Sequence, residues 1–307
     1  MSHKEIVIPN YNFDIKANIK VPPDVDTNRG IILSHGSIVN RKSLSRTSYC
    51  LAEYLSNELN AYVITPDYMG ETVHKNDVTF DALSKVLDAS VNHLCEVYNI
   101  DEVMGFGHSM GCYVLANNLK MNPKITSIVN YGGPTTDLLA KRQYNFINYM
   151  MKYLTSFNYN IDTRNLFKYI FDVETSNYLI DVMLKGKEFG YENYNYIIDP
   201  FLIREMILQL EAYHDTIKKW GKPAMLLFGT NDSLVRKSLK QMPDGFIDQN
   251  ITVNHIQNAS HVTPCMDTMS NLSKLQPIIT FYQNTYLYDV HLMNVNAIQK
   301  SQRINPD

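Results

Sequence analysis

Short hydrophobic runs alternate with longer stretches of helical period from about residue 30 onward. The short runs are rich in apolar and β-branched residues, whereas the stretches between them repeat their apolar side chains every three or four positions. This alternation is typical of a parallel sheet that is covered by helices on both faces. The strands that it predicts span residues 30–34, 62–65, 102–106, 125–130, 224–228 and 251–255.

Two further elements of the core follow from their periodicity. Residues 13–19 alternate between apolar and polar side chains and follow a short strand at 5–9, so we expect an antiparallel hairpin at the edge of the sheet. Residues 79–98 have a helical period with one apolar stripe, which predicts a helix that packs on the core. The stripe consists of Leu83, Val86, Leu87, Val91 and Leu94.

The pattern changes between residues 134 and 221, where helical stripes follow one another and no strand is predicted. One helix is expected to begin at Asp199 and Pro200, because Asp caps helices and Pro suits their first turn, and to end at Gly221. This segment holds 10 of the 21 tyrosines and 6 of the 12 phenylalanines. We therefore expect a helical subdomain, which either packs its aromatic residues into a core of its own or forms a cap that lines an apolar pocket.

The periodicity divides the chain into four parts. Residues 1–133 and 222–290 would form the core, residues 134–221 the helical cap, and residues 291–307 a C-terminal tail with little period. A chain of 307 residues is long enough for one large domain that carries such an insertion.

Composition and charge narrow the classes of function. Hydrophobic residues make up 45% and charged residues 19% of the chain, and the mean hydropathy is −0.24, as in globular proteins. Lys and Arg total 28 against 31 Asp and Glu, and no basic run occurs, so a nucleic-acid partner is not expected. No apolar run reaches the roughly 18–20 residues that span a bilayer, and no secretory signal precedes the first strand, so we expect a soluble, cytoplasmic protein without a membrane span.

Cysteine and histidine spacing argues against a metal site. The four cysteines lie far apart and form no Cys-x-x-Cys pair, which fits buried thiols in a reducing compartment. There is also no His-Glu-x-x-His motif and no carboxylate cluster at the spacing of metal ligands. We therefore expect neither a metal nor a cofactor.

The segment most informative about chemistry lies between a predicted strand and a predicted helix. Residues 107–111 read Gly-His-Ser-Met-Gly, a Gly-x-Ser-x-Gly motif with Ser109 at its centre. A tight strand-to-helix turn strains the backbone of such a serine and projects its hydroxyl above the sheet. Together with Gly105 the motif also resembles a glycine-rich dinucleotide loop, but Met110 stands where that fingerprint has its third glycine. We therefore expect Ser109 to be a nucleophile.

A nucleophilic serine needs a base that removes its proton and an acid that orients the base. Asp232 and His261 each follow the carboxyl end of a later predicted strand. The order Ser109, Asp232, His261 along the chain is that of one known type of catalytic triad. Asp137, which follows the predicted strand at 125–130, is an alternative acid.

With these residues the chain resembles the α/β-hydrolases from about residue 5 to 290. The sequence His-Gly-Ser at 35–37 follows the first parallel strand, where that family has its oxyanion loop. Residues 66–70 resemble the loop after the next strand, with Thr72 in place of a second glycine. The resemblance implies an α/β fold with a mostly parallel central sheet flanked by helices, and a helical cap inserted between strands 6 and 7.

The resemblance also implies a role for each residue of the site. Ser109 would attack the acyl carbon, and His261 would act first as general base and then as general acid. Asp232 would hold the imidazole in the required tautomer. The backbone N–H groups of Met110 and Ser37 would form the oxyanion hole.

Four further residues are candidates for substrate contact, namely His35, Gly36, Arg41 and His108. Three of them also have a structural explanation. Arg41 would brace the oxyanion loop through a salt bridge, His35 would hold the geometry of that loop, and His108 would pack beside the nucleophile. For Arg41 the alternative is contact with an anionic group of the substrate.

These observations predict a serine hydrolase that cleaves a carboxylic ester or an acyl thioester through an acyl-enzyme intermediate. The aromatic insert favours a small-molecule substrate with an apolar or aromatic acyl group, and acyl-CoA or an acyl-carrier protein are candidate donors for the thioester reaction. The alternatives are a thioesterase or acyltransferase that acts on a carrier-bound chain, a peptidase or amidase, and a ligand-binding receptor without catalysis. The sequence makes no prediction about the oligomeric state.

Overall fold

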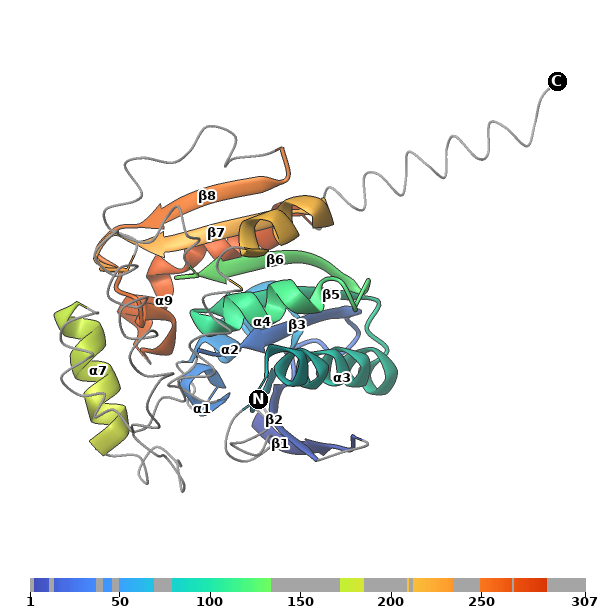
Figure 1. The fold of residues 1–307 in the computed structure, drawn as a ribbon. Helices are drawn as coiled ribbons and strands as arrows, with labels where there is room; N and C mark the ends of the chain where they lie inside the picture. The colour runs from blue at the N-terminus through green and yellow to red at the C-terminus, as the bar shows by residue number, and fades with distance from the viewer. Residues whose placement is uncertain are drawn as a thin grey trace, which may run out of the picture.

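A mostly parallel sheet forms the centre of the molecule (Figure 1). The computed structural model describes residues 3–10, 14–36, 41–45, 50–68, 79–133, 172–184, 209, 212–234, 249–266 and 268–285. Within these residues eight strands form one sheet in the order β1-β2-β4-β3-β5-β6-β7-β8. They span His3–Ile8 (β1), Ile15–Lys20 (β2), Arg29–Ser34 (β3), Tyr62–Pro66 (β4), Glu102–His108 (β5), Ile125–Tyr131 (β6), Ala224–Gly229 (β7) and Ile251–Ile256 (β8).

The described helices lie on both faces of the sheet. Figure 1 shows α3 and α4 in front of the sheet, with α2 and α9 behind it. The labelled helices are α1 (Arg41–Ser45), α2 (Leu51–Leu59), α3 (Phe80–Tyr98), α4 (Met110–Asn118), α7 (Val173–Leu184), the 3-10 helix η3 (Thr263–Cys265) and α9 (Met269–Lys274). Residues 212–220 and 276–285 are also helical.

The alternation of side chains along the strands produces two separate hydrophobic layers. In β3, Ile32 packs in the layer that includes α3 and α4, whereas Ile31 and Leu33 pack in the layer that includes α2. Successive side chains of a strand point to opposite faces, so a strand buried on both faces reads as a continuous apolar run. This explains why the parallel strands could be found in the sequence as short hydrophobic runs.

The predicted strands and the predicted edge hairpin are confirmed. Each of the six parallel strands occurs where expected, with its ends shifted by at most one or two residues, and β1 pairs antiparallel with β2. β2 also pairs antiparallel with β4, which joins the hairpin to the parallel strands β3 to β8. The predicted helix at 79–98 is α3, whose apolar stripe is fully buried and whose first turn is capped by the Thr79 side chain.

The region between β6 and β7 contributes two described helical pieces. These are α7 and residues 212–220, the second of which ends at Gly221, a glycine in the left-handed region with φ +72°. The predicted helix start at Asp199 and Pro200, most of the predicted cap, and the C-terminal tail at 291–307 lie outside the described residues. In the part of the chain that the structure describes, no helix is long and apolar enough to cross a membrane.

Candidate active site

The turn between β5 and α4 holds Ser109 in a strained backbone conformation. Its φ and ψ are 53° and −121°, and its side chain is half-buried at the end of the sheet. A positive φ is costly for a residue with a Cβ and persists only where the surroundings enforce it. Here the surroundings do so by close packing, because a Cβ at Gly111 would lie 2.1 Å from the Ser34 carbonyl oxygen. The turn therefore places Ser109 immediately before Met110, the first residue of α4.

His261 and Asp232 form a buried pair at the same edge of the sheet. Asp232 follows β7 and His261 follows β8, and the two strands are parallel neighbours. His261 Nδ1 donates to Asp232 Oδ2 at 2.8 Å, while the other carboxylate oxygen, Oδ1, accepts from the Leu234 N–H at 3.0 Å. Of the two acids weighed from the sequence, Asp232 is the one brought to His261, and Asp137 lies outside the described residues.

The pKa of His261 is raised above its ordinary value. Burial by itself disfavours the imidazolium and lowers the pKa, but the charge of Asp232 and its hydrogen bond favour the charged ring, as does the carboxylate of Asp172. Because Nδ1 is committed to Asp232, Nε2 is the ring atom through which His261 can exchange a proton with another group. The arrangement makes His261 a stronger base than a free imidazole.

Contacts from β5 and β6 hold the His261 loop against the serine turn. The Ser109 N–H donates to the Tyr131 carbonyl at 2.9 Å, and the Tyr131 hydroxyl donates to the Ser260 carbonyl at 2.6 Å. His108, which precedes the serine, contacts His261 directly, with ring centroids 5.3 Å apart. The three predicted triad residues therefore come from loops that are bonded to one another.

Gly132 is a position beside the His261–Asp232 pair that the sequence did not point to. It has φ +64°, and a Cβ there would lie 2.8 Å from His261 Nδ1 and 3.3 Å from Asp232 Oδ2. A side chain at this position would therefore collide with the buried pair. The Gly-Gly-Pro sequence at 132–134 signals a tight turn, but only the fold brings that turn to the histidine.

The expected oxyanion loop is described up to Gly36, which lies beside Ser109. A Cβ at Gly36 would lie 3.2 Å from the Ser109 Cβ. His35 is buried, and its Nδ1 donates to the Gly36 carbonyl at 2.8 Å while its Nε2 accepts from the Tyr68 N–H at 3.3 Å. Met110 is buried in the first turn of α4, and Ser37 lies outside the described residues.

Arg41 is buried in a network that ties the loop after β3 to the rest of the sheet. Its guanidinium forms an ion pair with Asp67 at the end of β4, and its Nε donates to Asn18 Oδ1 at 3.2 Å. A second guanidinium nitrogen lies 3.6 Å from the exposed Glu5 carboxylate. These contacts agree with the structural explanation for Arg41, a salt bridge that braces the loop after β3. They direct its guanidinium toward β2 and β4.

Two of the four thiols lie next to the site, and both are buried. Cys112 is buried in α4, its Sγ donates to the Tyr131 carbonyl at 3.4 Å, and burial raises its pKa well above the ordinary value. Cys265 is buried in η3. Among the described residues no group of three or more His, Cys, Asp or Glu side chains is arranged to hold a metal ion.

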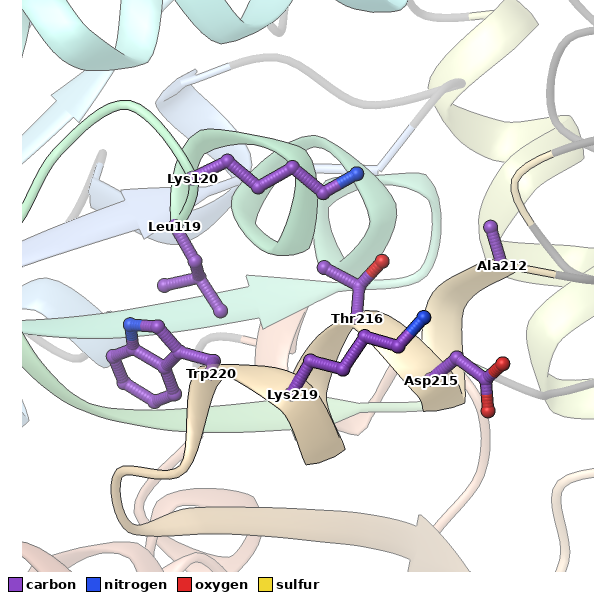
Figure 2. A pocket seen from close by; sticks show the side chains of 7 residues that line it. All are labelled: Leu119, Lys120, Ala212, Asp215, Thr216, Lys219 and Trp220. Atoms are coloured by element: carbon purple, nitrogen blue, oxygen red, sulfur yellow. The ribbon is translucent and has the colours of Figure 1, made fainter.

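A groove of about 390 Å³ lies at the opposite end of α4 from the serine (Figure 2). It lies between the C-terminal end of α4 and the helical residues 212–220. Ser109 precedes the first residue of α4 and Leu119 follows the last, so the rise of the helix separates them by roughly 15 Å. The groove is lined by Leu119, Lys120, Ala212, Asp215, Thr216, Lys219 and Trp220, and it is not part of the Ser109 site.

Comparison with known proteins gives likeness in structure alone. No family model matches the sequence, and no match was found among curated proteins. A thermostable carboxyl esterase from Bacillus coagulans is 14% identical with a TM-score of 0.64, and the alignment covers 93% of this chain and 99% of that one. 2-Hydroxy-6-oxo-6-phenylhexa-2,4-dienoate hydrolase from Rhodococcus sp. strain RHA1 is also 14% identical, with a TM-score of 0.59 and coverage of 92% and 99%.

A thermophilic esterase from Thermogutta terrifontis has the same identity of 14%, a TM-score of 0.58 and coverage of 95% and 100%. Each alignment spans nearly all of both chains, so the likeness includes the whole sheet and its helices. Identities this low carry over the fold and leave the chemistry to be argued from the residues. The sheet order, the helices on both faces and these likenesses identify the chain as a protein with the α/β-hydrolase fold.

Proposed function

We propose that the protein is a serine hydrolase that cleaves a carboxylic ester or an acyl thioester through an acyl-enzyme intermediate. The observation that carries the proposal is the meeting, at one edge of the sheet, of a strained serine turn and a buried histidine–carboxylate pair. Nucleophile, base and orienting acid are the three groups that covalent acyl transfer needs. Two of the proteins similar in fold are named as esterases, which agrees with this chemistry.

In the acylation step, Ser109 Oγ attacks the acyl carbon and its proton passes to His261 Nε2. Asp232 stabilises the resulting imidazolium through the 2.8 Å hydrogen bond to Nδ1. The backbone N–H groups of Met110 and Ser37 are the proposed donors to the oxyanion of the tetrahedral intermediate. The imidazolium then gives its proton to the leaving alkoxide or thiolate, and the bond from the acyl carbon to that group breaks.

In the deacylation step, water replaces the leaving group. His261 takes a proton from the water as its oxygen attacks the acyl carbon of the acyl-enzyme. Collapse of the second tetrahedral intermediate breaks the bond to Ser109 Oγ, which receives the proton from His261. The products are a carboxylic acid and the free enzyme, so no cofactor is required.

The acyl group is proposed to be apolar or aromatic. Half of the phenylalanines and nearly half of the tyrosines of the chain lie in the segment between β6 and β7, and Asp232 follows β7. The guanidinium of Arg41 is engaged by Asp67 and Asn18, which argues against its use as a receptor for an anionic substrate. Higher kcat/KM for long or aromatic acyl esters than for acetyl esters would support this specificity, and equal values would contradict it.

Labelling with a fluorophosphonate, read by intact mass, tests the proposed nucleophile. The expected result is one adduct on the wild type and none on Ser109→Ala, together with loss of turnover of p-nitrophenyl esters and acyl thioesters. The same panel ranks ester against thioester substrates. A folded wild type that forms no adduct would contradict the proposal and favour a ligand-binding role.

A further inference from the structure

His108 connects the nucleophile turn to the main chain of the catalytic histidine. It is the last residue of β5, next to Ser109, and its side chain is 2% exposed. Its Nε2 lies 2.8 Å from the carbonyl oxygen of His261, across 153 positions of sequence. A carbonyl oxygen only accepts, so Nε2 must carry the proton in this contact.

The other ring nitrogen of His108 faces a thiol. Cys265 Sγ lies 3.6 Å from His108 Nδ1, which suits an S–H that donates to an unprotonated nitrogen. Burial, and after it the neighbouring His261, lower the pKa of His108 to about 3, so the ring stays neutral over the working pH range. A neutral ring with its proton on Nε2 satisfies both contacts at once.

The carbonyl that His108 holds belongs to a segment without regular structure. Residues 257–262 join β8 to η3, and the imidazole of His261 projects from this segment toward Asp232. Tyr131 bonds the preceding residue, Ser260, from β6. His108 bonds His261 itself, and from the residue adjacent to the nucleophile, so it links the two partners of the proton transfer.

We infer that His108 is a positioning residue, which sets the position of His261 relative to Ser109 through the hydrogen bond from His108 Nε2 to the His261 carbonyl. The inference rests on the proposed serine-hydrolase function. In this inference His108 positions the base, His261, and does not contact the substrate. The rate of proton transfer falls steeply when its partners are misplaced, and a shift of about 1 Å can reduce a rate about 100-fold.

A matched pair of variants separates the hydrogen bond from the mere presence of a polar side chain. His108→Gln carries an amide N–H at nearly the reach of Nε2, whereas His108→Asn is one methylene shorter and cannot span the 2.8 Å contact. Both are neutral, polar and smaller than histidine, so their effects on folding should be similar. His93→Asn, on α3 and beside Tyr98, is the control for loss of a half-buried histidine away from the site.

The experiment measures fluorophosphonate labelling rate, kcat and KM for one p-nitrophenyl ester, and melting temperature for the wild type and the three variants. His108→Asn should lower both the labelling rate and kcat about 10- to 100-fold with KM little changed, while His108→Gln restores most of the loss. His93→Asn should match the wild type. A KM effect without a kcat effect would instead indicate substrate contact and overturn the inference.

The remaining outcomes are distinct from one another. A wild-type rate in His108→Asn, or equal losses in the Asn and Gln variants at equal melting temperatures, would overturn the positioning role and leave the proposed function intact. If His108→Asn does not fold, His108→Gln still decides, because a labelling rate far below that of the wild type in a folded Gln variant contradicts the inference. Absence of labelling in the folded wild type would remove the proposed function, and the inference with it.

Discussion

Two buried pairs of charged or chargeable groups lie at the ends of the parallel strands, and they differ in one partner. His261 and Asp232 follow β8 and β7, whereas Arg41 and Asp67 lie after β3 and β4. Both carboxylates are fully buried, and each binds a nitrogen of a buried partner. The partner is an imidazole in the first pair and a guanidinium in the second.

The difference in partner separates chemistry from architecture. An imidazole changes its charge near neutral pH, and the Asp232 carboxylate supports that change. A guanidinium remains charged at every relevant pH, so the pair with Asp67 cannot move a proton and can only hold its two loops together. The same type of buried contact therefore has a proposed catalytic role after β7 and β8, and a bracing role after β3 and β4.

Removal of the base should give the largest effect. His261→Ala should lower kcat about 10⁶-fold, because serine and histidine of a triad act as one unit. The loss is measured as the turnover of the best ester of the panel, with the wild type diluted until its rate equals that of the variant. A residual rate above about one hundredth of the wild type would contradict the assignment of His261 as the base.

Removal of the charge of Asp232 from the His261–Asp232 pair should give the second-largest loss of kcat. Asp232→Asn keeps the size of the side chain but does not enforce the tautomer with the proton on His261 Nδ1, and kcat should fall roughly 10⁴-fold. Asp232→Glu serves as the control for charge without the correct reach. The comparison fails if Asp232→Asn retains a wild-type rate, since Asp137 would then be the acid to examine.

The brace should respond in stability, with the chemistry of the folded protein largely kept. Arg41→Met leaves the Asp67 carboxylate buried without its cation, and should reduce the free energy of unfolding by about 3–5 kcal/mol. The double variant Arg41→Met, Asp67→Leu should recover much of this loss, because neither of the two buried charges remains. Urea unfolding monitored by circular dichroism measures both, and a single variant as stable as the wild type would contradict a bracing role.

The smallest effect should come from the distant carboxylate of Asp172. This residue caps α7 by accepting the Thr175 N–H at 2.8 Å, and its charge contributes to the raised pKa of His261. Asp172→Asn preserves the cap but removes the charge, so the pKa of His261 should fall. Since the reaction requires neutral His261, the acidic limb of the kcat/KM profile should move to lower pH.

The matched control for this shift is Asp181→Asn, an exposed carboxylate on the same helix. It should leave the acidic limb where the wild type has it. Equal pH profiles for Asp172→Asn and the wild type would contradict a contribution of Asp172 to the pKa of His261 and leave Asp232 as the carboxylate that raises it.

Local patterns account for what could be predicted from the sequence. Each buried strand is a continuous apolar run, and the serine turn is a motif of five consecutive residues, so both are readable without the fold. The chain order of Ser109, Asp232 and His261 was enough to predict a triad as a resemblance; the structure shows His261 and Asp232 in contact, and the triad itself stays a prediction. The partner of Arg41 could not be predicted from the sequence, because the pairing with Asp67 depends on how the loops after β3 and β4 meet.

The positions that support the proposed triad could not be predicted for the same reason. Gly132 is required by a histidine more than a hundred residues away, and His108 bonds a main-chain oxygen across 153 positions. No spacing rule connects such residues, because their contact arises only from the packing of neighbouring strands. A contact to a main-chain carbonyl also cannot be recognised in the sequence, because every residue type has such a carbonyl.

The pairing of β6 with β7 has a consequence for how the chain tolerates changes in length. The two strands are neighbours in the sheet, yet about ninety residues of sequence separate them. The entropy of closing a loop grows only with the logarithm of its length, so replacing a ten-residue connection by one of this length costs about 2 kcal/mol. Provided that Gly132 and Gly133 are kept, the connection between β6 and β7 is therefore a place where segments of very different length can be exchanged while the two strands stay paired.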